Sequence, residues 1–389
     1  RRAILRQSAT PRFVNRQTKH GARESGLIAD RDEDAVHAVA DDLRRTDLAV
    51  IGDARQPARH GFGEHEGEAF GDGRKDEEVT RPEDGFDVGG PTRQEDAGAQ
   101  FALDDLRLQH MDEAGVDVQV IGLTSPGVQI MDKETAVAFA PVANDILAEA
   151  TRRHPDRLVG MIAVAPQDPA AAAKEIQRGV NQLGMNSVVI NSHTHGEYLS
   201  DTKFWPIFEA AEAMDTPIYL HPNAMPASMI QHFLEAGLDG AIFGFGVETG
   251  LHAMRLITSG VFDKFPKLQV ILGHMGEALP FWAYRLDYMH AATVRSKRYP
   301  SVQPIQRKPS DYLRENFHIT NSGVAWGAAL KFTQDFMGPD RVRYAMDYPY
   351  QYVPEEVAIL ENLDMAPQVR QAFFEGNAER LFKIPPANK

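Results

Sequence analysis

Short apolar runs alternate with longer stretches of helical periodicity from Asp104 to the end of the sequence. This alternation is typical of repeated βα units, in which a crossover helix follows each strand. We predict strands at residues 118–123, 158–165, 187–191, 217–221, 268–273, 317–320 and 342–346, and helices at 132–154, 169–183, 204–214 and 278–293. The pattern predicts an α/β fold, a distorted (β/α)₈ TIM-like barrel whose first strand is missing or divergent.

Residues 1–103 differ from the rest of the chain. Arginine outnumbers lysine there, glycine and acidic residues recur, and apolar residues are sparse after Val50 and Ile51. Such a composition buries too little apolar area to offset the entropy lost on ordering. We expect residues 1–103 to be a poorly ordered or mistranslated segment, since GC-rich DNA read in a wrong frame gives text of this kind. A genuine disordered extension and a divergent real segment remain alternatives, and residues 104–389 are the predicted catalytic domain.

Charge and cysteine usage limit the function. The formal net charge is −14, which disfavours nucleic acid and anionic membranes and favours a small-molecule substrate. The chain has no cysteine, so a metal ion would have to be held by His, Asp and Glu. No apolar stretch approaches the roughly 18 residues that span a bilayer, and no signal peptide is recognisable. We therefore expect a cytoplasmic protein.

Three predicted strands run into residues that can bind a metal ion: His221, His274 and Asp347. The carboxyl ends of barrel strands meet at one mouth, where such enzymes keep their reactive groups. An imidazole and a carboxylate suit a divalent cation, and a site rich in oxygen ligands favours Mn²⁺, with Zn²⁺ possible. The sequence therefore predicts a divalent metal ion at this mouth.

Glu277 follows His274 by three residues, a spacing that would let its carboxylate orient the imidazole and raise its basicity. His274 and Glu277 are therefore candidate catalytic residues. The alternative is that Glu277 only complements a helix dipole.

Other patterns carry less chemistry. His193 and His195 form an H-x-H pair in a polar loop, where we expect solvated rather than metal-binding side chains. The glycine-rich run at residues 244–250 lacks the spacing of a dinucleotide or phosphate site, and we predict a turn. Ser322 is expected in a polar pocket loop rather than as a nucleophile.

Several strings resemble the amidohydrolase superfamily and, within it, the decarboxylase branch. They are LHP at 220–222, GHMGEALPFWAYRLD at 273–287, TNSG at 320–323 and AMDYPYQ at 345–351. LTSPGVQ at 123–129, VAPQDP at 164–169 and EAGLDGAIFGFGVETG at 235–250 are most similar to 5-carboxyvanillate decarboxylases, which are related to γ-resorcylate decarboxylases. The resemblance covers roughly Asp104 to Ile384.

The resemblance implies a barrel with one divalent metal ion, no organic cofactor and assembly into a homodimer or homotetramer. It implies His221 and Asp347 as metal ligands beside His274, and Arg285, Asn321 and Thr124 as substrate-binding residues. One feature departs from the family: the first-strand Glu ligand has no recognisable counterpart before Asp104. The residues around Glu68 resemble that motif only weakly, and Glu68 is not assigned as the metal ligand.

The implied reaction is metal-dependent, non-oxidative decarboxylation of a phenolic aromatic acid, with 5-carboxyvanillate as the favoured substrate. Loss of CO₂ from an aryl carboxylate requires a proton on the ring carbon first, and we predict that Asp347 delivers it. His274, poised by Glu277, would manage that proton. The alternatives are a metal-dependent hydrolase of a lactone or amide and an inactive barrel that lacks its first-strand ligand.

Overall fold

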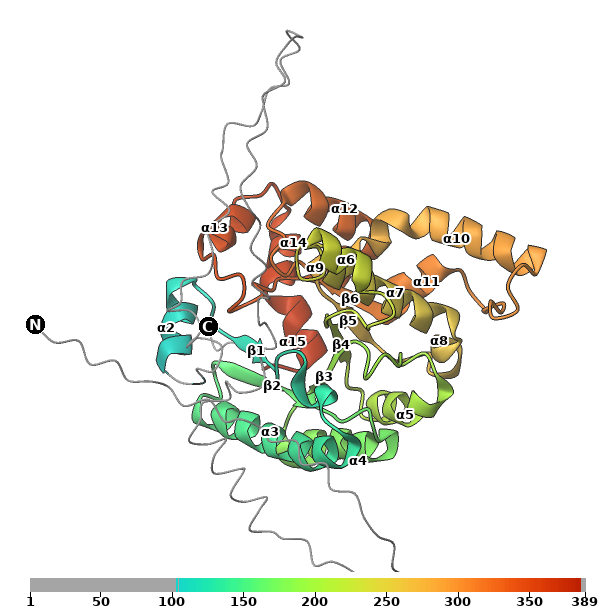
Figure 1. Ribbon diagram of the computed structural model, residues 1–389. Coiled ribbons are helices and arrows are strands. Elements are labelled where there is room, and N and C mark those ends of the chain that lie inside the picture. The colour runs from blue at the N-terminus through green and yellow to red at the C-terminus, as the bar shows by residue number, and fades with distance from the viewer. Residues whose placement is uncertain (1–102, 104, 386–389) are drawn as a thin grey trace, which may run out of the picture. The chain divides into compact units, whose positions relative to one another are not determined.

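Seven parallel strands form the centre of the computed structural model, which describes Leu103 and residues 105–385. Each strand pairs with the next one in the sequence, so the spatial order is β1 to β7 (Figure 1). The strands are β1 (Gln119–Ile121), β2 (Leu158–Ala163), β3 (Ser187–Asn191), β4 (Ile218–His221), β5 (Val270–Leu272), β6 (Phe317–Thr320) and β7 (Val342–Arg343). The prediction of an α/β fold of successive βα units is confirmed.

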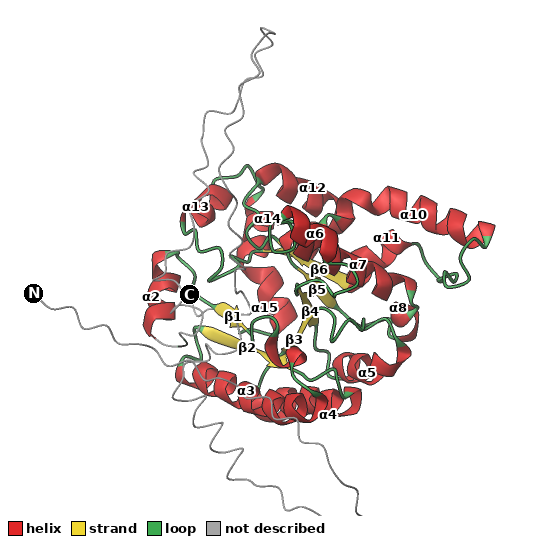
Figure 2. Ribbon diagram, in the orientation of Figure 1, coloured by secondary structure: helices red, strands yellow, loops and turns green. Residues whose placement is uncertain are grey.

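Helices lie around these strands and form the outer layer of the curled sheet (Figure 2). The α-helices are α2 (Asp105–Glu113), α3 (Lys133–Arg153), α4 (Pro169–Leu183), α5 (Trp205–Ala213), α6 (Gln231–Ala236), α7 (Gly244–Thr258), α8 (Val261–Lys264), α9 (His274–Glu277), α10 (Leu279–Ser296), α11 (Pro309–Asn316), α12 (Gly327–Met337), α13 (Glu355–Glu361), α14 (Pro367–Gln371) and α15 (Asn377–Phe382). Shorter helical turns are η3 (Gly127–Ile130), η4 (Thr202–Phe204), η5 (Pro339–Arg341) and η6 (Ala372–Gly376). Within the described residues, no helix combines the length and the apolar character that crossing a membrane requires.

Local sequence signals set several helix ends. The Asp132 side chain accepts a hydrogen bond from the Thr135 amide at 2.9 Å and begins α3. Asp168 does the same for α4, with Pro169 in the first turn, and Gly184 ends that helix at a left-handed φ of 71°. These caps explain why the predicted bounds of both helices agree with the observed ones.

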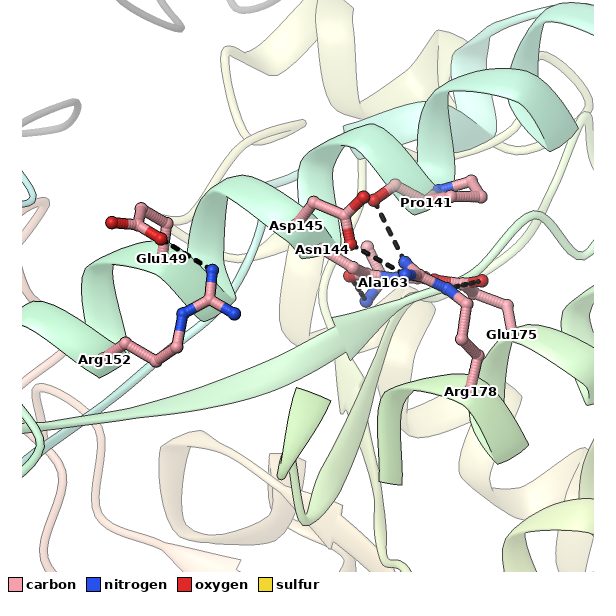
Figure 3. A network of polar contacts seen from close by, with 8 residues as sticks. All are labelled: Pro141, Asn144, Asp145, Glu149, Arg152, Ala163, Glu175 and Arg178. Atoms are coloured by element: carbon pink, nitrogen blue, oxygen red, sulfur yellow. Dashed lines mark hydrogen bonds and ion pairs between the residues drawn. The ribbon is translucent and has the colours of Figure 1, made fainter. Parts of the chain in front are cut away.

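Buried polar contacts join the outer helices to the sheet. Asn144 of α3 is fully buried and exchanges two hydrogen bonds with the backbone of Ala163, at 2.7 and 2.8 Å. Asn144 also donates to Glu175 of α4 at 2.7 Å. Figure 3 shows Arg178 reaching the same carboxylate and the carbonyl of Pro141, which lies inside α3. This network fixes α3 and α4 against the end of β2.

The prediction of a turn at residues 244–250 is wrong, because these residues form the first two turns of α7. Helical glycines are unfavourable unless close packing requires them. A Cβ atom on Gly246 would lie 2.8 Å from the Glu277 Oε2 atom, and one on Gly250 would lie 3.5 Å from the Glu277 carbonyl. The glycines therefore let α7 approach the segment that carries Glu277. Strand β7 is also shorter than predicted, since its ladder ends at Arg343.

Candidate active site

Three strand ends bring His221, His274 and Asp347 to the same end of the sheet. His221 is the last residue of β4, His274 follows β5 after one residue, and Asp347 lies in the loop after β7. The His274 Nε2 atom is 3.9 Å from the Asp347 Oδ2 atom. His221 and Asp347 each shift the pKa of the other through their charges. The residues predicted from strand ends therefore lie together, although more than 120 positions separate His221 from Asp347.

A left-handed turn orients His274. Five consecutive residues, 274 to 278, have positive φ angles, and four of them are not glycine. A left-handed conformation costs such residues about 1–2 kcal/mol each, so it persists only where the surroundings hold it. The turn brings the His274 Nδ1 atom to 2.6 Å from the Glu277 Oε1 atom. The contact supports the prediction that Glu277 orients the imidazole, and that role stays a prediction.

Both neighbouring carboxylates act on the His274 imidazole. Burial lowers the pKa of His274, but the contacts with Asp347 and Glu277 more than offset it and raise that pKa to about 10. The Glu277 side chain is only 4% exposed, so water screens this interaction weakly. His274 is therefore a cation near neutral pH, with its Nδ1 proton directed at Glu277 and its Nε2 proton on the side of Asp347.

Asp347 sits in a backbone turn of its own. Its φ angle is 69°, and its carbonyl accepts a hydrogen bond from the Gln351 amide at 3.0 Å. The Gln351 side chain donates to the Gly323 carbonyl at 2.7 Å and so joins this loop to the loop after β6. Burial raises the pKa of Asp347, but His274 and then His221 outweigh burial and lower it below its ordinary value. Asp347 is thus a carboxylate at rest.

His221 and Asp347 offer donor atoms that suit a divalent cation. The His221 Nδ1 atom lies 2.8 Å from the Pro222 carbonyl oxygen, which only accepts, so Nδ1 carries the proton and Nε2 keeps its lone pair. Burial lowers the pKa of His221, which favours the neutral form that binds metals. In the described part of the chain, no three His, Asp or Glu residues gather as a complete metal site. Glu68 lies outside the described residues.

The expected substrate-binding residues differ in their surroundings. Thr124 Oγ1 contacts the Tyr350 hydroxyl at 2.9 Å and links the loop after β1 to the loop that carries Asp347. Asn321 is buried, and its side-chain oxygen accepts a hydrogen bond from the Ala345 amide at 2.9 Å. Arg285 is exposed on α10, and within the described residues no hydrogen bond or ion pair joins it to His274 or Asp347.

The weaker candidates have structural partners. His193 Nε2 contacts the Ala224 carbonyl at 2.8 Å, and His195 Nε2 contacts the Met131 carbonyl at 2.9 Å. The expectation of a solvated pair therefore holds only for His195, which is exposed, since His193 is 9% exposed. Ser322 Oγ lies 2.6 Å from the Thr320 hydroxyl, which agrees with a polar loop after β6.

Sequence reasoning missed a buried polar group next to this site. Ser192 Oγ donates to Glu248 at 2.9 Å and lies 2.9 Å from His252 Nδ1. Burial raises the pKa of Glu248 to about 7, and the charge of Glu277 adds to that increase. Glu248 and His252 are four residues apart on α7, so they share one helix face. Polar residues at that spacing in an otherwise apolar helix are the signal that could have revealed them.

Tyr219 was missed as well. It precedes His221 by two positions on β4, so its side chain points to the same side of the strand. Its buried hydroxyl lies 3.3 Å from Thr320 Oγ1 and 3.4 Å from Ser322 Oγ. These contacts form a polar layer below the candidate site.

The chain belongs to the amidohydrolase family, whose sequence model matches residues 79–384. The expected likeness to the decarboxylase branch is confirmed by named relatives. A 5-carboxyvanillate decarboxylase from Novosphingobium aromaticivorans, solved with manganese and 3-methoxy-4-hydroxy-5-nitrobenzoic acid, is 52% identical with a TM-score of 0.73, over 75% of this chain and 86% of that one.

Two proteins from Polaromonas are also similar. A dihydroxybenzoic acid decarboxylase, solved with manganese and 2-nitroresorcinol, is 34% identical with a TM-score of 0.70, over 75% of this chain and 90% of that one. A γ-resorcylate decarboxylase is 36% identical over 290 residues, which are 72% of this chain and 88% of that protein. The relatives thus act on small aromatic acids, and two were solved with manganese.

Proposed function

We propose that this protein is a metal-dependent decarboxylase of phenolic aromatic acids, with 5-carboxyvanillate as its substrate. The observation that carries the proposal is the connected set Glu277, His274 and Asp347, which holds a proton on His274 beside a carboxylate. The 52% identity to a 5-carboxyvanillate decarboxylase supports this substrate over γ-resorcylate, whose decarboxylase from Polaromonas is 36% identical.

Asp347 delivers the proton that the reaction needs. The ring carbon that bears the carboxylate takes a proton from Asp347, and the bond to the carboxyl carbon then breaks, so its electron pair returns to the ring and CO₂ leaves. That proton comes from His274, which passes it to Asp347 across their 3.9 Å contact before the transfer to the ring, because Asp347 is a carboxylate at rest. Glu277 keeps the imidazole oriented and cationic between turnovers. Protonation before bond cleavage gives the departing electron pair a place to go.

His221 and Asp347 would hold one divalent cation, with Mn²⁺ favoured because two relatives were solved with it. When bound, such a cation supplies Lewis acidity toward the carboxylate and phenolate oxygens of the substrate. Asn321, Thr124 and Arg285 stay assigned to substrate binding. For Asn321 the support is that its side-chain nitrogen is buried without a hydrogen-bond partner among the described residues.

We also propose that the protein is a homodimer or homotetramer. The support is a run of exposed aromatic side chains along α10, which include Phe281, Tyr284 and Tyr288 at 73%, 85% and 62% exposure. Exposed apolar patches of this kind are typical of surfaces that bind another protein chain.

Release of CO₂ tests the proposed function directly. The full chain, loaded with Mn²⁺, should release one CO₂ per molecule of 5-carboxyvanillate and form vanillate. γ-Resorcylate and an aryl lactone serve as competing substrates, and opening of the lactone without CO₂ release would favour a hydrolase instead. Asp347→Asn should lower turnover by roughly 10²–10⁴. Full turnover by that variant would reject Asp347 as the acid.

A further inference from the structure

A cavity of about 270 Å³ opens at the end of the barrel opposite the candidate active site. Its lining comes from Gln269, just before β5, from the segment before β7 and from α15. Arg341, Arg343 and Arg380 all line it, whereas Asp340 is its one acidic lining residue. The lining thus carries an excess of two positive charges in a chain of net charge −14.

Arg343 gives this cavity an unsatisfied cation. The residue is 1% exposed, and its Nε and Nη1 atoms are buried without a hydrogen-bond partner among the described residues. A buried charge without a counter-ion or hydrogen bonds is costly, so such groups are normally paired. Burial, together with Arg341 and Arg380, lowers the pKa of Arg343 to about 9, which still leaves it charged at neutral pH.

His318 adds to the excess of donors. Its Nδ1 atom lies 2.8 Å from Arg343 Nη2, and its Nε2 atom lies 3.1 Å from Arg341 Nη1. Burial and the surrounding guanidinium groups lower the pKa of His318 to about 2, so the ring is neutral. A neutral imidazole has one acceptor and one N–H group, and it can satisfy only one of the two arginines. At least one donor therefore faces another donor.

Neighbouring side chains hold the arginines in place but do not neutralise them. Asn377 is buried and donates to the Pro339 and Val342 carbonyls, each at 2.7 Å, while its oxygen accepts from Arg380. Asp340 lies 4.0 Å from Arg341 Nε and is 69% exposed, so water screens its charge.

We propose that this cavity is a binding site for a small dianionic oxyanion, of the phosphate or dicarboxylate class. The anion pairs with the Arg341 and Arg380 guanidinium groups of the lining, and its charge compensates the buried, unpaired charge of Arg343. Planar guanidinium groups suit the paired oxygens of both classes. The site lies at the far end of the strands from His221, His274 and Asp347, so it is separate from the decarboxylation site.

Titration calorimetry on the full, Mn²⁺-loaded chain tests the proposal with sodium phosphate in one arm and sodium succinate in the other, both against sodium chloride at matched ionic strength. We expect saturable binding of one anion per chain in at least one arm, and the tighter arm identifies the class. Arg343→Met should weaken binding at least about tenfold, because it removes the buried positive charge that the anion compensates. Arg380→Met should also weaken it, and this rim variant keeps the test valid if Arg343→Met does not fold.

Arg152→Met is the matched control, because Arg152 is exposed and pairs with Glu149 on the outer helix α3. It should bind the anion as the unchanged chain does. Binding that is equally strong in Arg343→Met and Arg380→Met would place the anion elsewhere and overturn the proposal. If neither phosphate nor succinate binds saturably, the cavity holds only water and the proposal is overturned too.

Thermal unfolding gives a second readout. Without added anion, Arg343→Met should unfold at a higher temperature than the unchanged chain, because the variant removes an unpaired buried charge. Saturating anion should raise the midpoint of the unchanged chain by about 3 °C or more and leave the variant unmoved. If Arg343→Met without anion unfolds at a lower temperature than the unchanged chain, the Arg343 charge is not an unpaired, destabilising one.

Discussion

His274 is held between two carboxylates, and this arrangement decides its charge. An isolated histidine titrates near 6.5, whereas Asp347 and Glu277 overcome the effect of burial and raise the pKa of His274 to about 10. The proton that the imidazole carries is therefore present over the whole physiological pH range. In the proposed mechanism, this histidine therefore supplies a proton to Asp347 rather than removing one from the substrate.

The pKa of His274 makes a prediction about stability. A group whose pKa is higher in the folded state stabilises the fold fully below its unfolded value, and the effect is lost as the pH rises through the folded value. In chelator-treated protein, the contribution of His274 should therefore decline between about pH 6.5 and 10. Glu277→Gln should make that decline smaller, as measured by urea unfolding at several pH values.

A second histidine controls for general titration effects. His232 is 91% exposed and pairs with Glu235 at 3.5 Å. His232→Gln should leave the pH dependence of stability unchanged. If Glu277→Gln also leaves it unchanged, the Glu277 contact does not set the charge of His274.

At the scale of elements, α7 and the left-handed turn fit together through two glycines. Gly246 and Gly250 lie four residues apart on α7, and both face the segment that carries Glu277. Close approach of two backbones explains glycine inside this helix. Alanine substitutions at the two positions form a matched pair, because a Cβ atom would be too close to Glu277 at Gly246 but not at Gly250.

Gly246→Ala should impair catalysis. The new Cβ atom would lie 2.8 Å from Glu277 Oε2, so that carboxylate must move away from its contact with His274. Displacement by a fraction of an ångström to one ångström is enough to lower kcat, here by at least about tenfold. The rate of CO₂ release from 5-carboxyvanillate measures the change in kcat.

Gly250→Ala is the control for this change. Its Cβ atom would lie 3.5 Å or more from Glu277, which is ordinary contact. Alanine in a helix interior should stabilise the protein by about 0.5–1 kcal/mol and leave kcat unchanged. Equal kcat values for the two variants would show that Gly246 does not position Glu277.

The contact between α3 and β2 makes a separate prediction. Asn144→Ala removes hydrogen bonds to both backbone groups of Ala163 and to Glu175 (Figure 3). We expect a loss of about 2–4 kcal/mol in the free energy of unfolding, since buried partners are left without hydrogen bonds. Arg152→Ala, at an exposed pair in the same figure, should change it by less than about 1 kcal/mol. Urea denaturation distinguishes the two outcomes.

The elements that sequence could predict are those with local signals. Short apolar runs located all seven described strands, and helical periodicity located α3 and α4, whose ends the structure shows capped by Asp132 and Asp168. Residues 244–250 were mistaken for a turn because helix propensity is local, whereas the packing that permits glycine there involves Glu277, distant in sequence. The left-handed conformation of residues 274–278 was equally hidden, since four of the five side chains normally avoid it.

At the scale of the whole molecule, the candidate site forms because the carboxyl ends of all the parallel strands lie at the same end of the sheet. Histidine at the ends of β4 and β5 could be placed from sequence because every strand in such a barrel has the same direction. The contact of Ser192 with Glu248 and His252 could not be predicted, since only tertiary packing brings Ser192 next to α7. The charge cluster of Arg341, Arg343 and His318 likewise arises from residues on β6 and before or within β7.

The exposed aromatic residues of α10 predict self-association. Figure 1 shows this helix, in orange, running away from the strands. Replacing Tyr284 and Tyr288 by glutamate should shift the protein to a smaller species in sedimentation velocity, because charge at the centre of an apolar interface is unfavourable. Ile359→Glu, at a partly exposed position of α13, is the control. An unchanged sedimentation coefficient would place the interface elsewhere.

The left-handed turn at residues 274–278 has a consequence for protein engineering. Handedness of the backbone, rather than choice of side-chain rotamer, sets where the imidazole points, and isolated L-residues do not keep that handedness. A loop grafted with the letters HMGEA onto another scaffold would therefore rewind to a right-handed form and aim its histidine elsewhere. The contact between His274 and Glu277 can be transferred only together with the strands and the glycine-containing helix that surround it.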